Sequence, residues 1–133
     1  MEKLLMMGTG LASKEIVEYA KSQGVFTIVT DYLEPEKSTA KLVSDDYWMI
    51  NTGDLDELEV KCRAEGITAV ICGVSEFNLE MTMALCKRLG LPCYCTPEAW
   101  HYSRDKADFK DLCKKIGAPV ATDYYVSDLL TDE

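Results

Sequence analysis

The strongest constraint on the fold is the alternation of short apolar runs with helix-forming stretches along the chain. The apolar runs, several rich in the β-branched and aromatic residues that favour strands, cover residues 3–7, 25–30, 47–50, 68–73 and 91–95. Stretches with helical periodicity or helix-capping residues lie between them, at 13–23, 39–43, 54–66 and 76–89. Strands that alternate with helices over short connections form parallel sheets. The sequence therefore predicts an α/β fold: a doubly wound, mostly parallel five-stranded sheet with helices on both faces.

Size and charge narrow the classes of partner. The chain has 133 residues, enough for one ordinary domain, and its net charge is −9. An acidic protein is repelled by nucleic acid and by anionic membranes, so we expect neither as a partner. The apolar run before Gly8 is too short for a membrane span and fits a strand better than a signal peptide. We expect a cytoplasmic protein.

The six cysteines are spread along the chain and form no CxxC motif. A domain of this size buries a sufficient hydrophobic core without disulfide bonds or structural metal ions, so we expect reduced thiols. Cys93 and Cys95 would share one face of a strand, which leaves a metal or redox role open. His101 is the only histidine and has no partner at ligand spacing, so we predict no metal site.

A glycine turn, Gly8-Thr9-Gly10, follows the first apolar run and precedes a helix. The first glycine allows a tight turn, and the second lets an anion approach the backbone at a helix N-terminus. Asp31 ends the second run, where dinucleotide-binding enzymes keep an acid for the ribose hydroxyls. This Rossmann-like pattern keeps an NAD- or FAD-binding domain as an alternative, although Ser13 replaces the third small residue. The simpler interpretation is that any doubly wound domain needs glycine at this turn.

Glu76 begins a helix directly after the fourth run. Ligands of open α/β sheets bind at the carboxyl ends of the strands, so the glycine turn, Asp31 and Glu76 should gather along one edge. The alternative for Glu76 is an ordinary first-turn acid favoured by the helix dipole. No serine or cysteine has a histidine base at a recognisable spacing, and we predict no catalytic residue.

A further amphipathic helix is predicted for residues 103–116, with Ser103 as its N-cap. Its apolar side chains recur at i, i+3, i+4 and i+7, at Phe109, Leu112, Cys113 and Ile116. Gly117 is suited to end the helix and Pro119 prevents it from resuming.

The stretch from residue 73 to residue 120 carries a more specific pattern. A glutamate-bearing turn is followed by a helix that ends in "LGLP", by a short run, and by "DKADFKDLCKKIGAP". This order resembles ATP-grasp enzymes where their N-terminal domain meets the ATP-binding part. Biotin carboxylase, the carbamoyl-phosphate synthase large subunit and several amino-acid and purine ligases share this layout. With the glycine turn and Asp31, the resemblance covers essentially the whole chain.

The resemblance implies a division of the chain and a role for one lysine. Residues 1–97 would be a Rossmann-like pre-ATP-grasp domain, and residues 98–133 the opening segment of a truncated ATP-grasp domain, with a first strand at 124–133. Lys106 matches the first lysine that contacts ATP in that family; its alternative is an ordinary surface lysine. Substrate-side loops would be formed by Gly8, Thr9, Gly10, Asp31 and Glu76.

The resemblance further implies that the parent protein is an ATP-dependent carboxylate–amine ligase, nearest to carbamoyl-phosphate synthase, that acts through an acyl phosphate. ATP and magnesium would serve the complete enzyme, and none is expected to be bound to this chain, which we expect to be inactive alone. Its partners would be a small-molecule substrate and the remainder of the enzyme. The apolar face of the 103–116 helix would fold back on residues 1–97 or pair with a second copy in a homodimer. A dinucleotide-binding domain and a non-catalytic regulatory module remain the alternatives.

Overall fold

The computed structural model describes residues 1–124 and divides the chain into two compact units, Met1–Cys95 and Thr96–Glu133. Each unit is described by itself. The strand expected at residues 124–133 lies almost wholly outside the described residues. Among the helices at residues 1–124, none is long and apolar enough to cross a membrane.

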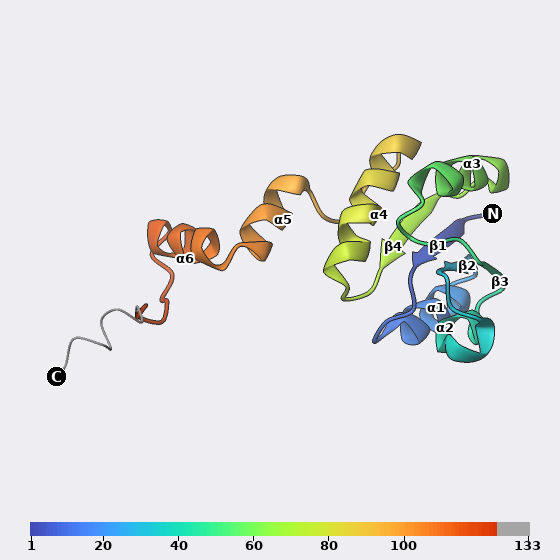
Figure 1. Cartoon of the computed structure of the whole chain (residues 1–133), viewed down its shortest axis with the longest axis horizontal. Coiled ribbons are helices and arrows are strands. Elements are labelled where there is room, and N and C mark those ends of the chain that lie inside the picture. Colours follow the sequence, from blue (N-terminus) through green and yellow to red (C-terminus); the bar gives the residue numbers. More distant parts are fainter. Residues whose placement is uncertain (125–133) are drawn as a thin grey trace. The chain divides into compact units, whose positions relative to one another are not determined.

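The first unit is built on a parallel sheet of four strands in the order β3-β2-β1-β4 (Figure 1). The strands are β1 (Lys3–Met7), β2 (Phe26–Thr30), β3 (Asp46–Trp48) and β4 (Ala69–Cys72). In the central register Leu5 pairs with Ile28 on one side and with Val70 on the other. All three pairings are parallel, so every carboxyl end meets the same edge of the sheet.

The prediction of a fifth strand at residues 91–95 is wrong: these residues form no ladder with β4. Leu91 and Cys93 instead pack their side chains against the core, and the Tyr94 hydroxyl lies 3.0 Å from Cys72 Sγ. A strand exists only when backbone groups pair with a neighbour, and Pro92 has no N–H to contribute. Residues 91–95 therefore pack on the core of the first unit through their side chains and not through backbone pairing.

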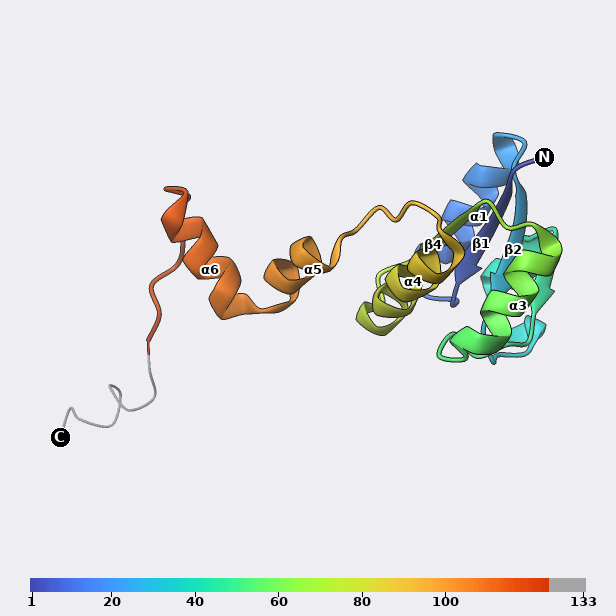
Figure 2. The ribbon, with the colours of Figure 1, turned by 90° about the horizontal axis from the view of Figure 1, so that it is seen from above.

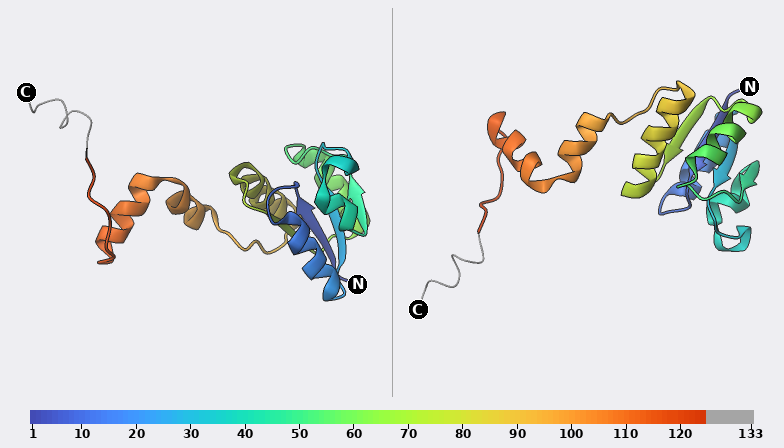
Figure 3. Two further views of the ribbon diagram at one scale, coloured as in Figure 1. Left: turned by 90° about the horizontal axis from the view of Figure 1, so that it is seen from below. Right: turned by 45° about the horizontal axis from the view of Figure 1, so that its top comes forward.

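Helices cover both faces of the sheet, as the alternation predicted. They are α1 (Ser13–Ser22), α2 (Thr39–Val43), α3 (Leu55–Glu65) and α4 (Glu76–Leu89), with a 3-10 helix at Pro35–Lys37. Leu5 packs with Leu58 of α3 and Leu85 of α4 in one core cluster, whereas Met6 packs with Val17 of α1 in a second cluster. Successive strand residues point to opposite faces, so β1 serves both layers. Figures 2 and 3 show the same layers from further sides.

Helix caps reveal a second difference from the sequence prediction. Asp54 and Ser75 cap α3 and α4 as expected. The helix predicted from Ser103 is two helices, α5 (Pro97–Arg104) and α6 (Lys106–Lys115), and Asp105 caps the second. The Asp105 carboxylate accepts hydrogen bonds from two first-turn amides, whereas the Ser103 hydroxyl donates to the Ala99 carbonyl inside α5.

Candidate functional site

The glycine turn lies at the carboxyl edge of the sheet, directly after β1. Gly8 has a φ of +82° and donates its N–H to the Thr30 carbonyl at 2.8 Å. A Cβ on Gly8 would lie 2.2 Å from Asn78 Nδ2, so both the backbone conformation and the space require glycine. Gly10 donates its N–H to Ser13 Oγ at 2.9 Å. These bonds tie the turn to β2 and to the start of α1.

The N-terminus of α1 differs from the other α-helix starts at residues 1–124. Its N-cap is Ala12, in the left-handed conformation with a φ of 66°, and no side chain caps the helix. Side chains of Ser38, Asp54 and Ser75 cap the other three α-helices of the first unit. The Ser13 N–H donates to the Gly10 carbonyl at 3.2 Å, and no side chain caps the next two amides, those of Lys14 and Glu15.

Asn78, which the sequence analysis did not single out, organises this edge from the first turn of α4. Its Oδ1 accepts a hydrogen bond from Thr52 Oγ1 at 2.8 Å, and its Nδ2 lies against Gly8. Its own N–H donates to Ser75 Oγ at 3.3 Å. The only local signal was a small amide side chain placed three residues after a predicted N-cap. Asn78 thus ties the loop before α3 to the glycine turn.

The β4–α4 turn approaches the glycine turn closely. A Cβ on Gly73 would lie 3.2 Å from the Leu11 carbonyl oxygen and from Ser13 Oγ. Glu76 follows as the first, exposed residue of α4. The fold therefore brings Gly8–Gly10 together with the turn that leads to Glu76, as predicted. The exposed side chains along these turns are mainly apolar: Leu11 at 81%, Val74 at 73% and Phe77 at 53%.

Asp31 lies at the same edge, but its side chain is turned inward and is only 4% exposed. Its Oδ1 is 2.8 Å from Lys41 Nζ and accepts the Leu33 N–H at 2.8 Å. Lys41, which the sequence analysis missed, also donates to the Asp31 and Leu33 carbonyls at 3.0 and 2.6 Å. Asp31 Oδ2 is buried and has no hydrogen-bond partner within residues 1–124. The pair fixes the loop after β2, and ligand contact by Asp31 stays a prediction.

In the second unit, Lys106 is the first residue of α6 and is exposed. Lys110 and Lys114 follow on successive turns of the same helix, and both pair with Asp123. Donation by Lys110 holds the pKa of Asp123 below its usual value. Lys106 has no ion pair among residues 1–124. All three lysines line an open depression of about 500 Å³.

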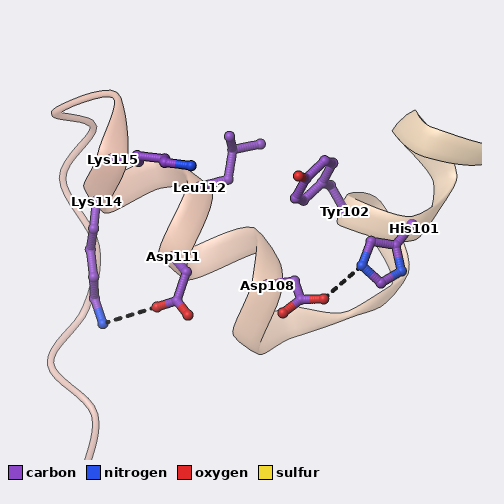
Figure 4. A pocket seen from close by; sticks show the side chains of 7 residues that line it. All are labelled: His101, Tyr102, Asp108, Asp111, Leu112, Lys114 and Lys115. Atoms are coloured by element: carbon purple, nitrogen blue, oxygen red, sulfur yellow. Dashed lines mark ion pairs between the residues drawn. The ribbon is translucent and has the colours of Figure 1, made fainter.

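Two more hollows lie against α6. One, of about 340 Å³, is lined by Lys106 and by the apolar side chains of Phe109, Pro119 and Val120. The other, of about 630 Å³, lies between α5 and α6 (Figure 4). There His101 Nε2 is 2.7 Å from Asp108 Oδ2. The role of Lys106 in binding ATP stays a prediction, but an unpaired cation in the first turn of a helix suits a phosphate.

Comparison with known proteins places this arrangement among enzymes of one fold. No protein-family model matches the chain, and no curated protein sequence matches it. Solved structures do match. N5-carboxyaminoimidazole ribonucleotide synthetase from Thermotoga maritima has a TM-score of 0.72 and 23% identity, over 97% of this chain and 36% of that one. Pyruvate carboxylase from Rhizobium etli has a TM-score of 0.73 and 14% identity, over 92% of this chain and 13% of that one.

A third match carries nucleotide ligands. The biotin carboxylase domain of the Hydrogenobacter thermophilus 2-oxoglutarate carboxylase, a dimer solved with MgADP, ADP and bicarbonate, has a TM-score of 0.70 and 20% identity. The alignment covers 90% of this chain and 28% of that one. At such identities the likeness shows the fold alone. This chain spans only about a third of these proteins or less, and they are ATP-grasp ligases, as the sequence resemblance indicated.

Proposed function

We propose that this chain is the N-terminal part of an ATP-dependent ligase that joins a carboxylate or bicarbonate to an amine. The observation that carries the proposal is the extent of the fold likeness, which reaches over 97% of the chain. A likeness confined to the sheet would fit any doubly wound domain, but this one includes most of Thr96–Glu133 as well. The proposed division is a pre-ATP-grasp domain at 1–97 and the beginning of an ATP-grasp domain at 98–133.

ATP would be contacted by Lys106. Lys106 is the first residue of α6 and carries a compact ammonium group. The Asp105 carboxylate already accepts hydrogen bonds from two amides of the same helical turn. In the complete enzyme, ATP would supply the phosphoryl group that activates the carboxylate as an acyl phosphate. Within residues 1–124 no three His, Cys, Asp or Glu side chains are grouped to hold a metal. The ligands for magnesium would therefore come from the remainder of the enzyme.

The carboxyl edge of the first unit would face the acceptor substrate. The glycine turn leaves the first-turn amides of α1 without a side-chain cap, and Glu76 adds an exposed carboxylate beside it. Backbone N–H groups suit an anionic or carbonyl oxygen, and a carboxylate suits an amine. In this proposal Gly8, Thr9, Gly10 and Glu76 contact the substrate. Contact by Asp31 stays a prediction, and its partner Lys41 holds the neighbouring loop.

The alternative of an NAD- or FAD-binding domain is less well supported. A dinucleotide needs an acid that is free to accept the ribose hydroxyls at the end of the second strand. Here Asp31 is 4% exposed and one of its oxygens is bonded to Lys41. The glycine turn alone fits either function.

A regulatory module without catalysis has no specific observation in its favour. We further propose that the enzyme is cytoplasmic and nearest to carbamoyl-phosphate synthase.

Titration by NMR tests the proposal on the chain as it is. MgATP should shift the backbone amides around residues 105–110, weakly but saturably, and Lys106→Ala should abolish the shifts. Lys115→Ala is the matched control because it removes a lysine from the same helix, and it should keep them. Saturable shifts at residues 8–12 with NAD, and none with MgATP, would favour the dinucleotide alternative. No response to either nucleotide would overturn ATP binding by this chain.

Turnover gives a second test. The chain alone should release no ADP from MgATP in the presence of bicarbonate, because no magnesium site is assembled within residues 1–124. Magnesium-dependent release of ADP that disappears with Lys106→Ala would show that the chain is catalytically complete, which contradicts the proposed division.

A further inference from the structure

Three lysines, Lys106, Lys110 and Lys114, form a row along one face of α6. Each is four residues from the next, so successive side chains leave the helix about 6 Å apart along its axis. All three line the same open depression of about 500 Å³. The chain as a whole has a net charge of −9, so this lysine row is a local reversal of its charge. Such a surface attracts anions.

A carboxylate from outside the helix already pairs with part of the lysine row. Asp123 forms ion pairs with Lys110 and Lys114, and Lys114 Nζ lies 3.6 Å from Asp123 Oδ2. The Lys110 ammonium group also donates to the Ala121 carbonyl at 3.1 Å. The segment after α6 therefore returns to the helix and supplies its own anion to the lysine row.

Asp111, the other acid that lines the depression, is placed differently. It belongs to α6 itself, and its Oδ1 lies 3.8 Å from Lys114 Nζ (Figure 4). Its side chain is 77% exposed, against 39% for Asp123. An exposed pair within one helix contributes little. Asp123, in contrast, pairs with two lysines at once, so it must move before another anion can reach both of them.

The lysine row keeps hydrogen-bond donors for a ligand. An ammonium group has three N–H donors. Lys106 has no ion pair within residues 1–124, and the two pairs of Lys114, at 3.6 and 3.8 Å, are longer than hydrogen bonds. Asp123 thus offsets part of the charge while leaving most of the donors unused. A ligand with anionic oxygens spaced along a chain would engage all three ammonium groups, which one carboxylate cannot do.

We propose that the lysine row binds an oligophosphate, either the phosphate chain of a nucleoside triphosphate or free tripolyphosphate, and that Asp123 is an internal competitor which the ligand displaces. The proposal rests on the function proposed above, because it extends the ATP contact from Lys106 to Lys110 and Lys114. An oligophosphate carries several charges along its length, and lysines bind phosphate as compact point charges. Binding would therefore release residues 121–123 from α6.

The first test is titration of the full chain with sodium tripolyphosphate, followed by NMR at the amides of residues 106–115 and 121–123. Asp123→Asn keeps the size of the side chain and removes its charge, so it should tighten binding by about threefold to tenfold. Asp108→Asn is the matched control, because it removes the same charge from α6 at a residue that pairs with His101 and does not line the depression. It should change the dissociation constant by less than about twofold. Equal effects of the two substitutions would overturn the proposal.

Lysine variants test which cations hold the ligand. Lys114→Ala should weaken tripolyphosphate binding by about threefold or more. Lys115→Ala, which removes a lysine outside the depression, should leave binding unchanged. Circular dichroism would establish that each variant keeps its helices. Equal effects of the two substitutions would show that the ligand responds only to overall charge, which contradicts a site at the lysine row.

A readout on the unaltered chain needs no variant. Donation by Lys110, with a smaller contribution from Lys114, holds the pKa of Asp123 below its usual value. Saturating tripolyphosphate should raise that pKa, because the ligand takes both lysines from the carboxylate. The NMR signal of the Asp123 carboxyl carbon, followed against pH, measures the change. A titration midpoint that tripolyphosphate does not move would overturn the displacement of Asp123.

The same titrations with MgATP separate this proposal from the function proposed above. Tripolyphosphate binding without MgATP binding would keep the oligophosphate site and remove ATP as its ligand. MgATP binding that needs Lys106 but does not respond to Asp123→Asn would leave the proposed function standing and overturn the competition by Asp123. If neither the unaltered chain nor Asp123→Asn responds to tripolyphosphate, the oligophosphate site itself is wrong.

Discussion

Lys41 Nζ lies 2.8 Å from Asp31 Oδ1, and the two side chains are 0% and 6% exposed. The pair is thus buried at the carboxyl edge of the sheet, where Lys41 also bonds two backbone carbonyls of the loop after β2. Two buried charges compensate each other only while both are present. This relationship makes the loop beside the candidate site depend on a lysine from α2.

Lys41→Met should therefore destabilise the first unit strongly. The substitution keeps the side-chain length but leaves Asp31 buried without its partner, at a cost of about 3–5 kcal/mol. Urea unfolding followed by circular dichroism measures the change. Lys21→Met is the control, because the pair of Lys21 with Asp45 is 37% and 27% exposed and should contribute less than about 1 kcal/mol. Equal effects of the two substitutions would contradict the structural role of Lys41.

Gly8→Ala should disturb the glycine turn. The new Cβ would meet Asn78 Nδ2 at 2.2 Å, and the φ of +82° is itself unfavourable for alanine. We expect a loss of about 1–3 kcal/mol in the free energy of unfolding, measured by thermal denaturation. Gly10→Ala is the matched control, since its new Cβ would lie 4.0 Å from Ser13 Oγ, an ordinary contact, and the φ of Gly10 is not positive. An unchanged melting temperature for Gly8→Ala would show that the turn does not need this geometry.

Asp45 should make the first unit sensitive to acid. Burial opposes its charge, but hydrogen bonds from Thr27 and the pairing with Lys21 outweigh burial and lower its pKa below the ordinary value of 3.8. A lowered folded pKa means that the stabilisation is complete above about pH 5 and is lost as the pH falls through the folded pKa. Asp45→Asn should therefore make the free energy of unfolding depend less on pH in the acid range, as measured by urea unfolding at a series of pH values. Asp46→Asn, at the next position, is the control and should leave the loss of stability at acid pH unchanged. If Asp46→Asn reduced that loss and Asp45→Asn did not, Asp45 would not be the group responsible.

A fragment of residues 1–95 should fold on its own. Both core clusters are formed by residues of this range, and the four paired strands lie within it. We expect a cooperative melt close to that of the full chain. The fragment should also self-associate less in sedimentation experiments, because removing the second unit removes Phe109 and Ile116, which are 51% and 70% exposed. An unfolded fragment would contradict the division of the chain into two units.

The sequence by itself determined the elements of the first unit and their layering. Helix α2 runs over Thr39–Val43, and Asp54 and Ser75 cap their helices, as local patterns predicted. Such features depend on hydrogen bonds and side-chain periodicity within a few residues, so they can be read from a short stretch of chain. The gathering of the glycine turn and the β4–α4 turn at one edge followed from the parallel topology alone.

Tertiary structure decided the features that depend on distant partners. Residues 91–95 have the composition of a strand, but a strand requires backbone pairing, and the segment instead places the Tyr94 hydroxyl against Cys72 of β4 and packs Leu91 and Cys93 on the core. Lys41 comes to Asp31 from a separate helix, and no pattern in the sequence indicated that buried pair. Asn78 meets Gly8 only because β1 pairs with β4 and places the start of α4 beside the first turn. Composition and spacing describe each of these residues correctly, but their roles depend on which side chains the folded chain brings within a few ångströms.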